Sequence, residues 1–442
     1  MKNKTTVGIA TLGCKVNQYE SEAIAESLTE KGFIIRNHTD VCDAYVINTC
    51  TVTSESDRKA RQFIRRMISK NPDAYILVAG CYSQVSPDEV AEIAGVDYIC
   101  GSSNKMSVVN KLCEFCLNGK KNEKAEICVP DLDHSDFEQM SINRFDRTRA
   151  YVKIEDGCES KCAYCTIPAS RGPIRSKPFD DVVNEVRTLT ENGVREVVLT
   201  GIETGSYGQD LEEKESFASL LCAIDKIEGI GRVRTGSLDP TVIKPAFTER
   251  IKDLSSLAPH FHLSLQSGSS RILALMKRKY NAKQAMECIE RLRSAIPQVM
   301  LTTDVIVGFP NETEEDFRES CEFVRKARFL MVHVFPYSKR KGTVAAEMDG
   351  QIPEHIKKER VAILSDIALD TRKKILDEKI EQNGVCEVLF ETYKNGYAYG
   401  HTADFIEVKV KCNRDLRSLF RDVKLISHDG NICEGILTDK SS

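Results

Sequence analysis

Short apolar runs alternate with segments of helical period over the first 142 residues of the chain. The runs lie at residues 7–10, 44–47 and 75–79, and helical periodicity follows at residues 20–30 and 57–69. Apolar runs of this length are typical of buried strands, and their alternation with helices predicts a doubly wound, parallel α/β sheet. The pattern fades after residue 100, and we expect the first domain to end at residue 142.

The next segment, residues 143–382, repeats a unit of one strand and one helix about six times. A complete barrel of this kind needs eight parallel strands, so six units predict an open, partial (β/α)6 barrel with its active face at the carboxyl ends of the strands. A helix rich in Lys and Arg, at residues 353–382, closes the segment. The six expected strands lie at residues 150–154, 196–200, 232–236, 260–265, 301–307 and 331–335.

The pattern changes in residues 383–442, where apolar and polar positions alternate in five short runs. Gly or Asp residues separate these runs, as is typical of strands joined by turns. Five short strands predict a small, OB-like β-barrel at the end of the chain. The runs lie at residues 386–392, 396–401, 405–411, 422–427 and 433–438.

Length, charge and cysteine content narrow the class of protein. The chain has 442 residues, 62 Lys and Arg against 66 Asp and Glu, and 17 cysteines. A chain of this length buries full-sized cores in about three domains without disulfide bonds. The nearly balanced charge excludes a polycation that binds nucleic acid by bulk attraction, so any contact with RNA must be local. The cysteines indicate metal or redox chemistry in a reducing compartment.

The sequence carries no apolar stretch of the roughly 18 residues that a membrane-spanning helix needs. The segment before Cys14 is also too short for the apolar core of an export signal. We therefore expect a cytoplasmic enzyme without a membrane partner.

Three cysteines with the spacing Cys-x-x-x-Cys-x-x-Cys follow the first strand of the partial barrel. Cys158, Cys162 and Cys165 can hold three irons of a 4Fe-4S cluster and leave the fourth iron without a protein ligand. Such an iron can bind another molecule, which predicts chemistry rather than electron storage. A zinc site is the alternative, and it needs a further ligand, for which His260 and His262 are candidates.

A second set of cysteines is indicated by position rather than by spacing. Cys14, Cys50 and Cys81 each follow one of the expected strands of the first domain. Because the carboxyl ends of parallel strands share one edge of a sheet, we expect these three thiols to converge there. They could hold a second 4Fe-4S cluster, again with one open iron. The alternative is that they are small core residues at strand ends.

The cysteine motif on a partial barrel resembles the radical S-adenosylmethionine (SAM) superfamily. The resemblance implies that the open iron chelates the amino and carboxylate groups of SAM and passes one electron to its sulfonium, which releases a 5′-deoxyadenosyl radical. It also implies that the backbone of Tyr164 positions the adenine and that Glu203 accepts hydrogen bonds from the SAM ammonium. Glu203 could instead be an ordinary loop acid. The other positions that match SAM-lining residues are Gly201, Gln266, Ser267 and Gly308.

Both cysteine sets together resemble the methylthiotransferase family over nearly the whole chain. The runs that carry this resemblance are residues 11–21, which include Leu-Gly-Cys-Lys-Val-Asn-Gln, residues 48–53 and residues 79–81. The last segment resembles the TRAM domain, an OB-like RNA-binding barrel. The resemblance implies a tRNA-modifying transferase with two 4Fe-4S clusters, in which one SAM methylates sulfur on the first-domain cluster and a second SAM generates the radical.

The residues after Cys14 resemble one branch of this family, which converts N6-threonylcarbamoyladenosine at position 37 of tRNA to its 2-methylthio derivative. Two other substrates stay open within the family, namely isopentenyladenosine at the same tRNA position and an aspartate of a ribosomal protein. A non-catalytic RNA-binding iron–sulfur protein is the alternative of another class. The motif of Cys158, Cys162 and Cys165 speaks against that alternative.

Basic and aromatic side chains give candidates for contact with the tRNA anticodon stem-loop. One group follows Cys50 on an expected helix, and the other lies in the last segment, where aromatic residues alternate with basic ones. A basic run on a helix is also typical of a solvated face. The family resemblance further implies an external electron donor and a sulfur donor of unknown identity. The RNA-binding candidates are Arg58, Lys59, Arg61, Arg65, Lys394 and Tyr397.

Overall fold

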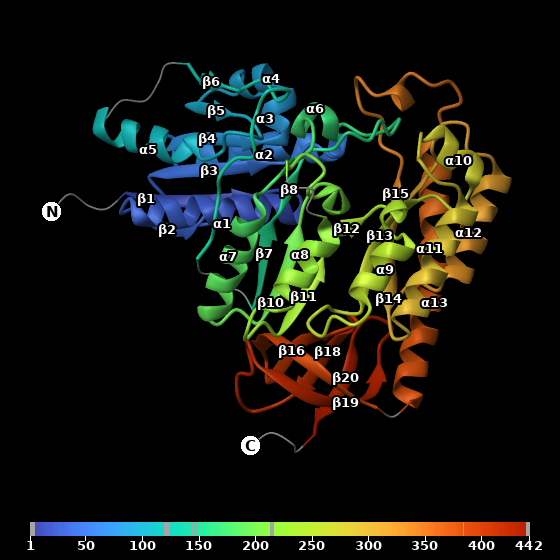
Figure 1. Cartoon of the computed structure of the whole chain (residues 1–442). Helices are drawn as coiled ribbons and strands as arrows, with labels where there is room; N and C mark the ends of the chain where they lie inside the picture. The colour runs from blue at the N-terminus through green and yellow to red at the C-terminus, as the bar shows by residue number, and fades with distance from the viewer. Residues whose placement is uncertain are drawn as a thin grey trace.

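The computed structural model describes residues 5–118, 124–143, 145, 148–212, 216–382 and 384–438. An α/β sheet, an open barrel and a small closed β-barrel follow one another along these residues (Figure 1). The predicted fold class is therefore confirmed. Among the described helices, none is long and apolar enough to cross a membrane.

The first sheet has six parallel strands in the order β2-β1-β3-β4-β5-β6. Helices α1 and α5 bury apolar side chains against one face of the sheet, and α2, α3 and α4 do so against the other. The sheet is thus doubly wound, with a reversal of strand order at β1 and β3, where such sheets commonly bind ligands. The elements are β1 (Thr6–Thr11), β2 (Ile34–Asn37), β3 (Ala44–Thr49), β4 (Tyr75–Gly80), β5 (Tyr98–Cys100), β6 (Glu126–Cys128), α1 (Lys15–Glu30), α2 (Ser54–Lys70), α3 (Cys81–Val85), α4 (Pro87–Ala91) and α5 (Ser107–Asn118).

The sheet continues past residue 100, where the sequence pattern fades. Strands β5 and β6 have three residues each, and all of β6 is exposed. Strand β2 forms one edge of the sheet and is also mostly exposed. Runs of three or four residues carry no clear period, whether exposed as in β6 or fully buried as in β5, so these strands could not be predicted from the pattern.

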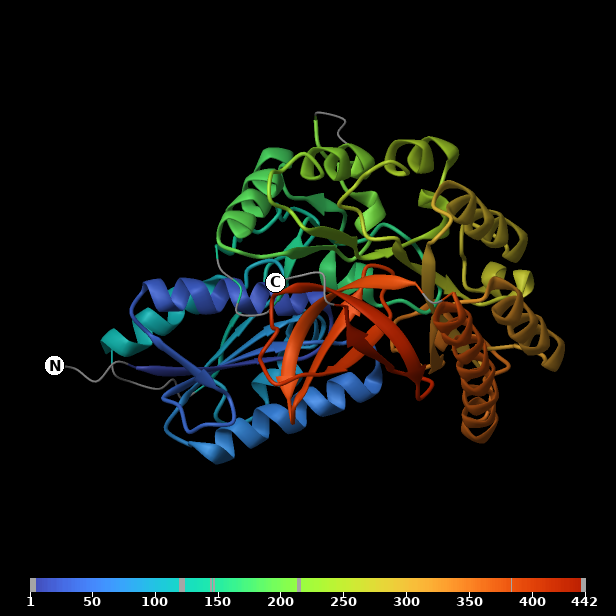
Figure 2. The ribbon, with the colours of Figure 1, turned by 90° about the horizontal axis from the view of Figure 1, so that it is seen from below.

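The open barrel contains all six strands expected in residues 143–382. Together with the two-residue strand β12 they form two parallel groups, β11-β10-β7 and β12-β13-β14-β15, so that β7 and β15 lie at the two ends of the open barrel and do not pair with each other. Figure 2 shows the helices that follow these strands along the outer side of an arc. The strands are β7 (Arg149–Lys153), β8 (Glu155–Asp156), β9 (Arg175–Ser176), β10 (Glu196–Thr200), β11 (Arg232–Thr235), β12 (Ser237–Leu238), β13 (His260–Gln266), β14 (Met300–Val307) and β15 (Met331–Pro336).

The helices of this segment bury the largest apolar core of the chain against the outer faces of the strands. The last of them, α13, has 28 residues and packs along β15 before it reaches the C-terminal barrel. The helices are α6 (Ile167–Arg171), α7 (Phe179–Glu191), α8 (Phe217–Ile224), α9 (Pro245–Ile251), α10 (Ser270–Leu275), α11 (Ala282–Ala295), α12 (Glu314–Ala327) and α13 (Glu354–Glu381), with short 3-10 helices at Thr204–Ser206, Pro240–Val242 and Val344–Ala346.

The C-terminal strands close into a five-stranded barrel in the order β16-β17-β18-β20-β19. This barrel lies below the amino ends of β7, β10 and β11 (Figure 1). Arg149 of β7 forms an ion pair with Glu391 of the barrel at 2.9 Å, and Arg232 of β11 pairs with Glu387 at 3.1 Å. The strands are β16 (Val385–Lys394), β17 (Tyr397–Thr402), β18 (Glu407–Lys411), β19 (Phe420–His428) and β20 (Cys433–Leu437).

Candidate functional site

Cys14, Cys50 and Cys81 lie at the carboxyl ends of β1, β3 and β4, which are neighbours in the first sheet. Cys14 is the residue before α1, Cys50 follows β3 directly, and Cys81 is the first residue of α3. All three thiols are free. The structure therefore brings the three cysteines to one edge of the sheet, as the strand positions predict.

Two glycines allow the chain to approach these thiols closely. A Cβ atom on Gly13, which has φ +102°, would lie 2.8 Å from the Sγ of Cys50. A Cβ atom on Gly80, which has φ +106°, would lie 2.5 Å from the backbone oxygen of Thr49. Neither position tolerates a side chain, because both the backbone conformation and the available space favour glycine.

A buried arginine contacts this set of thiols. Arg171 at the end of α6 donates a hydrogen bond from Nε to the Sγ of Cys81 at 3.1 Å, and its Nη2 donates to Oδ1 of Asn17. Burial, and then the neighbouring Cys81, raise the pKa of the Cys50 thiol to about 11. Thiols in such a site stay protonated unless a cation or metal stabilises the thiolate, which is the form that binds metal.

Arg171 also belongs to a buried network of charges that joins the first sheet to the open barrel. Its guanidinium pairs with Glu20 of α1 at 2.8 Å and with Asp156 of β8 at 3.1 Å. Lys153 of β7 pairs with the same two carboxylates, and Lys105 pairs with Glu20. The attraction of these cations holds the pKa of Glu20 well below its usual range, despite the opposing effect of burial. Three cations thus neutralise two buried carboxylates where the two segments meet.

Cys158, Cys162 and Cys165 lie on a loop directly after β8, at the carboxyl side of the barrel. Each sulfur has an N–H donor nearby. The backbone N–H of Ser160 lies 3.4 Å from the Sγ of Cys158, that of Ile167 lies 3.4 Å from the Sγ of Cys165, and Arg278 Nη1 lies 3.1 Å from the Sγ of Cys162. Burial raises the pKa of the Cys158 thiol, and it raises the pKa of Cys165 to about 12. The N–H donors oppose this effect, because they favour the anionic thiolate that cluster ligands require.

The geometry does not fit a single zinc ion at either set of cysteines. Within the described residues, one group of three metal-ligating side chains has its ligand atoms within 4.8 Å of one another, and it contains no cysteine. Four ligands around one zinc, at about 2.3 Å for each sulfur, would lie closer together than that. The proposed further ligands are also elsewhere, because His260 and His262 both contact Thr302. Among the described residues, the thiols of each set are therefore spaced more widely than the ligands of one zinc ion.

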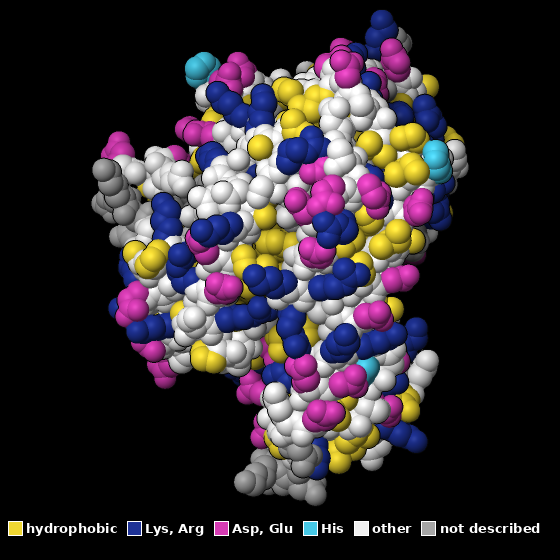
Figure 3. Space-filling model, turned by 90° about the vertical axis from the view of Figure 1, so that its right-hand side faces the viewer, with side chains coloured by type: hydrophobic (Ala, Val, Ile, Leu, Met, Phe, Trp, Pro, Cys, Tyr) yellow, Lys and Arg dark blue, Asp and Glu magenta, His cyan; other side chains and the backbone are white. Residues whose placement is uncertain are grey.

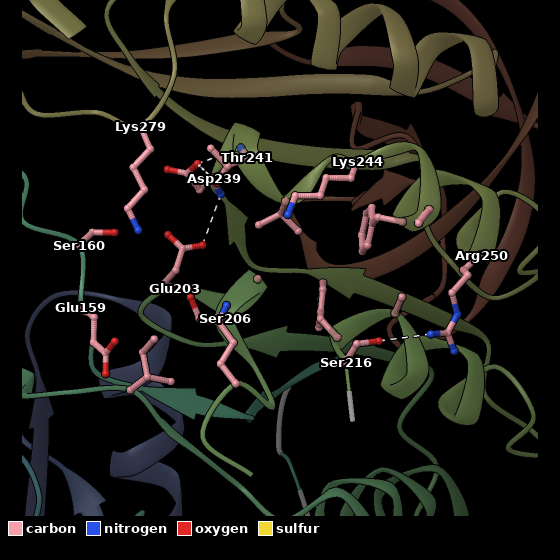
Figure 4. Close-up of a pocket in the computed structure, with 18 residues that line it drawn as sticks. Glu159, Ser160, Glu203, Ser206, Ser216, Asp239, Thr241, Lys244, Arg250 and Lys279 are labelled. Atoms are coloured by element: carbon pink, nitrogen blue, oxygen red, sulfur yellow. Dashed lines mark hydrogen bonds between the residues drawn. The ribbon is translucent and has the colours of Figure 1, made fainter. Parts of the chain in front are cut away.

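Glu203 lies beside the loop of Cys158, in a cavity of about 560 Å³. Figure 4 shows its carboxylate near the backbone of Asp239, which donates to Oε1 at 3.4 Å, with the ammonium of Lys279 on the opposite side. Burial, and then the charge of Asp239, raise the pKa of Glu203 to about 7. Glu203 is therefore not an ordinary solvated acid. It can gain or lose a proton near neutral pH and would be stabilised as an anion by a cationic ligand.

Backbone conformation and close packing describe the remaining candidates for the SAM site. Gly201 leaves space for Glu155, whose Oε2 would lie 2.6 Å from a Cβ there. Gln266 ends β13 with a left-handed φ of 70°, and the hydroxyl of Ser267 contacts Ser320 at 3.3 Å. Gly308 has φ +69° and packs against Lys357 of α13, so backbone conformation and close packing explain this glycine. The ring of half-buried Tyr164 packs edge-on against Phe309.

Two charged residues next to the barrel cysteines were not predicted from the sequence. Arg278 follows α10 and forms an ion pair with Asp239, besides its contact with Cys162. Asp239 directly follows β12, so its place after a strand was a signal that could have identified it. Arg278 lies 116 residues from Cys162 in the sequence, and no local motif marks it.

The RNA-binding candidates differ in whether their side chains are already paired within the protein. On α2, Arg58 pairs with Glu55, and Arg61 turns inward to donate to the hydroxyl of Tyr82 at 2.9 Å. Lys59 is exposed and lies 3.8 Å from Glu55, and Arg65 is exposed as well. Lys394 and Tyr397 pair with each other at the end of the β16–β17 hairpin. Figure 3 shows a band of Lys and Arg side chains across the middle of one face, with acidic side chains among them.

Two segments of the chain each match a known protein family. Residues 152–324 match the radical SAM superfamily, and residues 6–101 match the uncharacterized protein family UPF0004. The first match covers the cysteine loop and most of the barrel strands. The second covers all three cysteines of the first sheet.

Curated relatives match almost the full length. The chain is 38% identical over 434 residues to the threonylcarbamoyladenosine tRNA methylthiotransferase MtaB of Bacillus subtilis, which covers 95% of this chain and 94% of the relative. It is 37% identical to the protein of the same name from Thermotoga maritima, over 92% of this chain and 94% of that one. It is 35% identical to the tRNA-2-methylthio-N(6)-dimethylallyladenosine synthase of Aquifex aeolicus, over 98% of each chain.

A solved structure with a similar fold is the radical SAM methyltransferase TsrM of Kitasatospora setae. It superposes with a TM-score of 0.57 at 13% identity, over 77% of this chain and 76% of that chain. At this identity the likeness concerns the fold alone.

Proposed function

The chain belongs to the radical SAM methylthiotransferase family, and we propose that it methylthiolates C2 of N6-threonylcarbamoyladenosine at position 37 of tRNA. The observation that carries this proposal is the presence of two separate sets of three thiols, with the buried guanidinium of Arg171 in contact with Cys81 of the first set and with Asp156, which precedes the loop of the second. A reaction that both removes a hydrogen from an adenine C–H bond and delivers sulfur to the same carbon needs two reactive centres near one substrate atom.

The cofactors of this family are SAM and 4Fe-4S clusters. We propose that Cys158, Cys162 and Cys165 hold one cluster and that Cys14, Cys50 and Cys81 hold the other. When bound, these groups supply the radical and the methylated sulfur. The donor set fits them, since all six thiols are free and N–H groups are aimed at the sulfurs of Cys81, Cys158, Cys162 and Cys165.

The protein side chains bind and orient SAM and limit access of water. We propose that the carboxylate of Glu203 accepts hydrogen bonds from the SAM ammonium, because burial makes an ion pair at this position stronger than in water. Gly201 leaves room for Glu155, which accepts a hydrogen bond from the backbone N–H of Glu203 at 2.8 Å. Tyr164, Gln266, Ser267 and Gly308 are the further positions that we propose to lie near bound SAM. The first sheet caps the carboxyl side of the barrel, where a loop contact from Arg340 to Asp57 at 2.7 Å holds it.

Three observations support threonylcarbamoyladenosine as the substrate. Relatives with this activity in their names are 37% and 38% identical over more than nine-tenths of the chain. Lys15 directly follows Cys14, in the run that resembles this branch. The inner face of the barrel also carries charged side chains, which suit an anionic nucleoside better than an apolar isopentenyl group.

We further propose that the anticodon stem-loop lies along α2 and the β16–β17 hairpin. Exposed Arg65 is available to contact phosphates, and exposed Lys59 lies 3.8 Å from Glu55, whereas Arg58 would first have to leave its closer pairing with Glu55. Lys394 and Tyr397 offer a phosphate contact and a stacking surface on the hairpin. Arg61, which contacts Tyr82, positions the helix rather than the RNA. A tRNA substrate also places the reaction in the cytoplasm and requires an external electron donor and a sulfur donor.

Nucleoside mass spectrometry tests the substrate. The gene is expressed in a bacterial strain that lacks its own enzymes for both 2-methylthio nucleosides of tRNA position 37, and total tRNA is digested. We expect 2-methylthio-N6-threonylcarbamoyladenosine to appear and N6-threonylcarbamoyladenosine to decrease, while the variant Cys162→Ala produces neither change. Formation of the isopentenyl product alone, or of neither product by protein that contains both clusters, would refute the proposal.

A further inference from the structure

The inner face of the open barrel carries polar side chains on the three strands that lead to its free edge. On β13, β14 and β15, alternate residues such as Leu263, Val305 and Val334 pack into the outer apolar core. Because side chains alternate along a strand, their neighbours face the inside of the barrel. These inward residues include His262, Ser264 and Gln266 on β13, Thr302 and Asp304 on β14, and His333 and Phe335 on β15.

Three of the inward side chains form one compact cluster. The imidazoles of His262 and His333 and the carboxylate of Asp304 have ligand atoms within 4.8 Å of one another. His262 Nε2 lies 3.3 Å from Oδ2 of Asp304, and Nδ1 of His262 contacts the hydroxyl of Thr302 at 2.9 Å. The cluster remains accessible, since the Asp304 side chain is 30% exposed and His333 is exposed. Accessible polar groups on the inside of a barrel are suited to a ligand.

Lys15 approaches the same cluster from the first sheet. It is the first residue of α1, and α1 packs on β7 at the free edge of the barrel. Burial, and then the charges of Arg149 and Arg234, lower the pKa of Lys15 to about 8, and the carboxylates of Glu196 and Asp304 oppose this shift. Burial lowers the pKa of His333, and the charges of His262 and Lys15 lower it further. The side chain of Lys15 makes no hydrogen bond or ion pair with any residue that the structure describes.

We infer that Lys15, Asp304, His262 and His333 form the subsite that recognises the threonyl group of the substrate, a 2-amino-3-hydroxy acid attached through its nitrogen. The Lys15 ammonium binds the free carboxylate, and the carboxylate of Asp304 accepts a hydrogen bond from the hydroxyl. The two imidazoles hold Asp304 and complete the polar lining. This inference rests on the proposed function and assigns its specificity to one face of the barrel.

The charges of this subsite favour the threonyl group over a divalent cation and over an isopentenyl group. Two His and one Asp could bind a divalent cation, but the unpaired ammonium of Lys15 at the same place disfavours a second cation and favours an anion. An isopentenyl group would leave Lys15 and Asp304 without partners after displacing their water. A site built for polar groups rejects an analogue that lacks them, because its own polar groups lose their hydrogen bonds.

Binding of short RNA tests the inference without catalysis. Fluorescence anisotropy is measured with protein that contains both clusters and with anticodon stem-loops that carry N6-threonylcarbamoyladenosine, its methyl ester, isopentenyladenosine or plain adenosine. We expect Lys15→Gln to weaken binding of the threonylcarbamoyl loop about tenfold, as for loss of a charge-assisted hydrogen bond, and to leave the plain loop within about twofold. The ester should lose a similar factor with the parent protein.

Matched controls separate this role from folding. Lys31→Gln at the opposite end of α1 removes the same charge and should leave all four affinities unchanged. Asp304→Asn is far from any cysteine ligand in the sequence and should selectively weaken the threonylcarbamoyl loop. The ester should bind Lys15→Gln as well as the acid does, because the interaction that distinguishes them is already gone.

The outcomes distinguish the inference from the proposed function. If the parent protein forms the threonylcarbamoyl product and yet Lys15→Gln and Asp304→Asn retain its preference for the acid loop over the ester, the subsite assignment is wrong and the proposed function stands. If the parent protein forms only the isopentenyl product, the proposed function fails, and the assignment fails with it.

Discussion

The Nε of Arg171 lies 3.1 Å from the Sγ of Cys81, and the same guanidinium pairs with Asp156, two residues before Cys158. One buried side chain therefore contacts a thiol of the first sheet and the strand that leads into the cysteine loop of the barrel. Because a planar guanidinium has five N–H donors in a fixed arrangement, it can fix the relative position of the two segments and donate to sulfur at the same time.

Arg171→Lys should lower the reduction potential of the cluster that we propose on Cys14, Cys50 and Cys81. Lysine keeps the charge, but it cannot donate to Cys81 while it pairs with both Glu20 and Asp156. Loss of one charge-assisted hydrogen bond to sulfur destabilises the more negative, reduced cluster by roughly 30 to 60 mV for a one-electron couple. A redox titration followed by EPR measures the shift.

Arg278→Lys is the matched control, because Arg278 donates to Cys162 of the other set at the same distance of 3.1 Å. It should shift the barrel cluster and leave the first-sheet cluster unchanged. Equal shifts of both clusters in either variant would mean that the two arginines act through the general field of the protein rather than through these contacts.

Single cysteine variants should each remove one cluster. Cys50→Ala and Cys162→Ala are expected to reduce about eight irons per chain to about four, since a cube held by two thiolates is lost on purification. Cys50→Ala should retain SAM cleavage and lose methylthiolation, whereas Cys162→Ala should lose both. Iron and sulfide analysis of anaerobically purified protein and detection of 5′-deoxyadenosine check these results.

Cys100→Ala provides the control for this series. Cys100 is the last residue of β5 in the same sheet, but it is fully buried within the apolar core beside α5. Its removal should leave the iron content at about eight. A loss of iron in Cys100→Ala would contradict the assignment of Cys14, Cys50 and Cys81 as the complete first-sheet set.

The positions of the cysteines could be predicted from the sequence because they depend on strand ends. Strands β1, β3 and β4 have six residues each and are largely buried, so their apolar runs are long enough to read. Parallel pairing then brings residues 14, 50 and 81 to one edge without knowledge of any distant contact. The C-terminal barrel could be predicted for the same reason, since its strands alternate over five to ten residues.

The residues that tune the site could not be predicted in this way. Arg171 lies 90 residues from Cys81 in the sequence, and its partners on α1 and β8 come together only when the barrel packs on the first sheet. Buried charges of this kind look like surface residues in a sequence, because burial of an ion is tolerated only where partners compensate it. The inward cluster of His262, Asp304 and His333 was hidden by the same dependence on packing.

Phe405 should show an unusual order of stability among its variants. It has a left-handed φ of 74°, and its ring stacks on His260 at 4.4 Å between the C-terminal barrel and β13. Removal of the ring costs packing in both Phe405→Ala and Phe405→Gly, but glycine adopts this φ without strain. We expect Phe405→Gly to exceed Phe405→Ala by about 1 kcal/mol in free energy of unfolding, with both below the parent.

Denaturant unfolding, followed by circular dichroism, measures these differences. In an ordinary loop alanine is the more stable residue, because glycine has more conformational freedom in the unfolded chain. Greater stability of Phe405→Ala would therefore show that the left-handed conformation of residue 405 relaxes once the ring is removed.

The affinity for SAM should rise with pH through neutrality. Burial, and then the charge of Asp239, raise the pKa of Glu203 to about 7, so its carboxyl group is neutral below this pH and charged above it. A charged carboxylate attracts the SAM ammonium, so SAM binds to the deprotonated form of Glu203 and about one proton is released for each SAM bound below the pKa. We therefore expect the affinity for SAM to increase between pH 6 and pH 7.5. Equilibrium binding to protein with both clusters measures the dependence, and Glu203→Gln should bind SAM more weakly without it.

Stability without SAM should change in the opposite direction over an overlapping range. Because the pKa of Glu203 is raised in the folded protein, the folded state holds more protons than the unfolded chain between about pH 4.3, the ordinary value for glutamate, and about pH 7. The contribution of Glu203 to the free energy of unfolding is therefore complete below this window and is lost as the pH rises through it. Glu203→Gln should remove that loss. If SAM affinity and the stability difference between the parent and Glu203→Gln changed in the same direction, the carboxylate would not be the group that meets the ammonium.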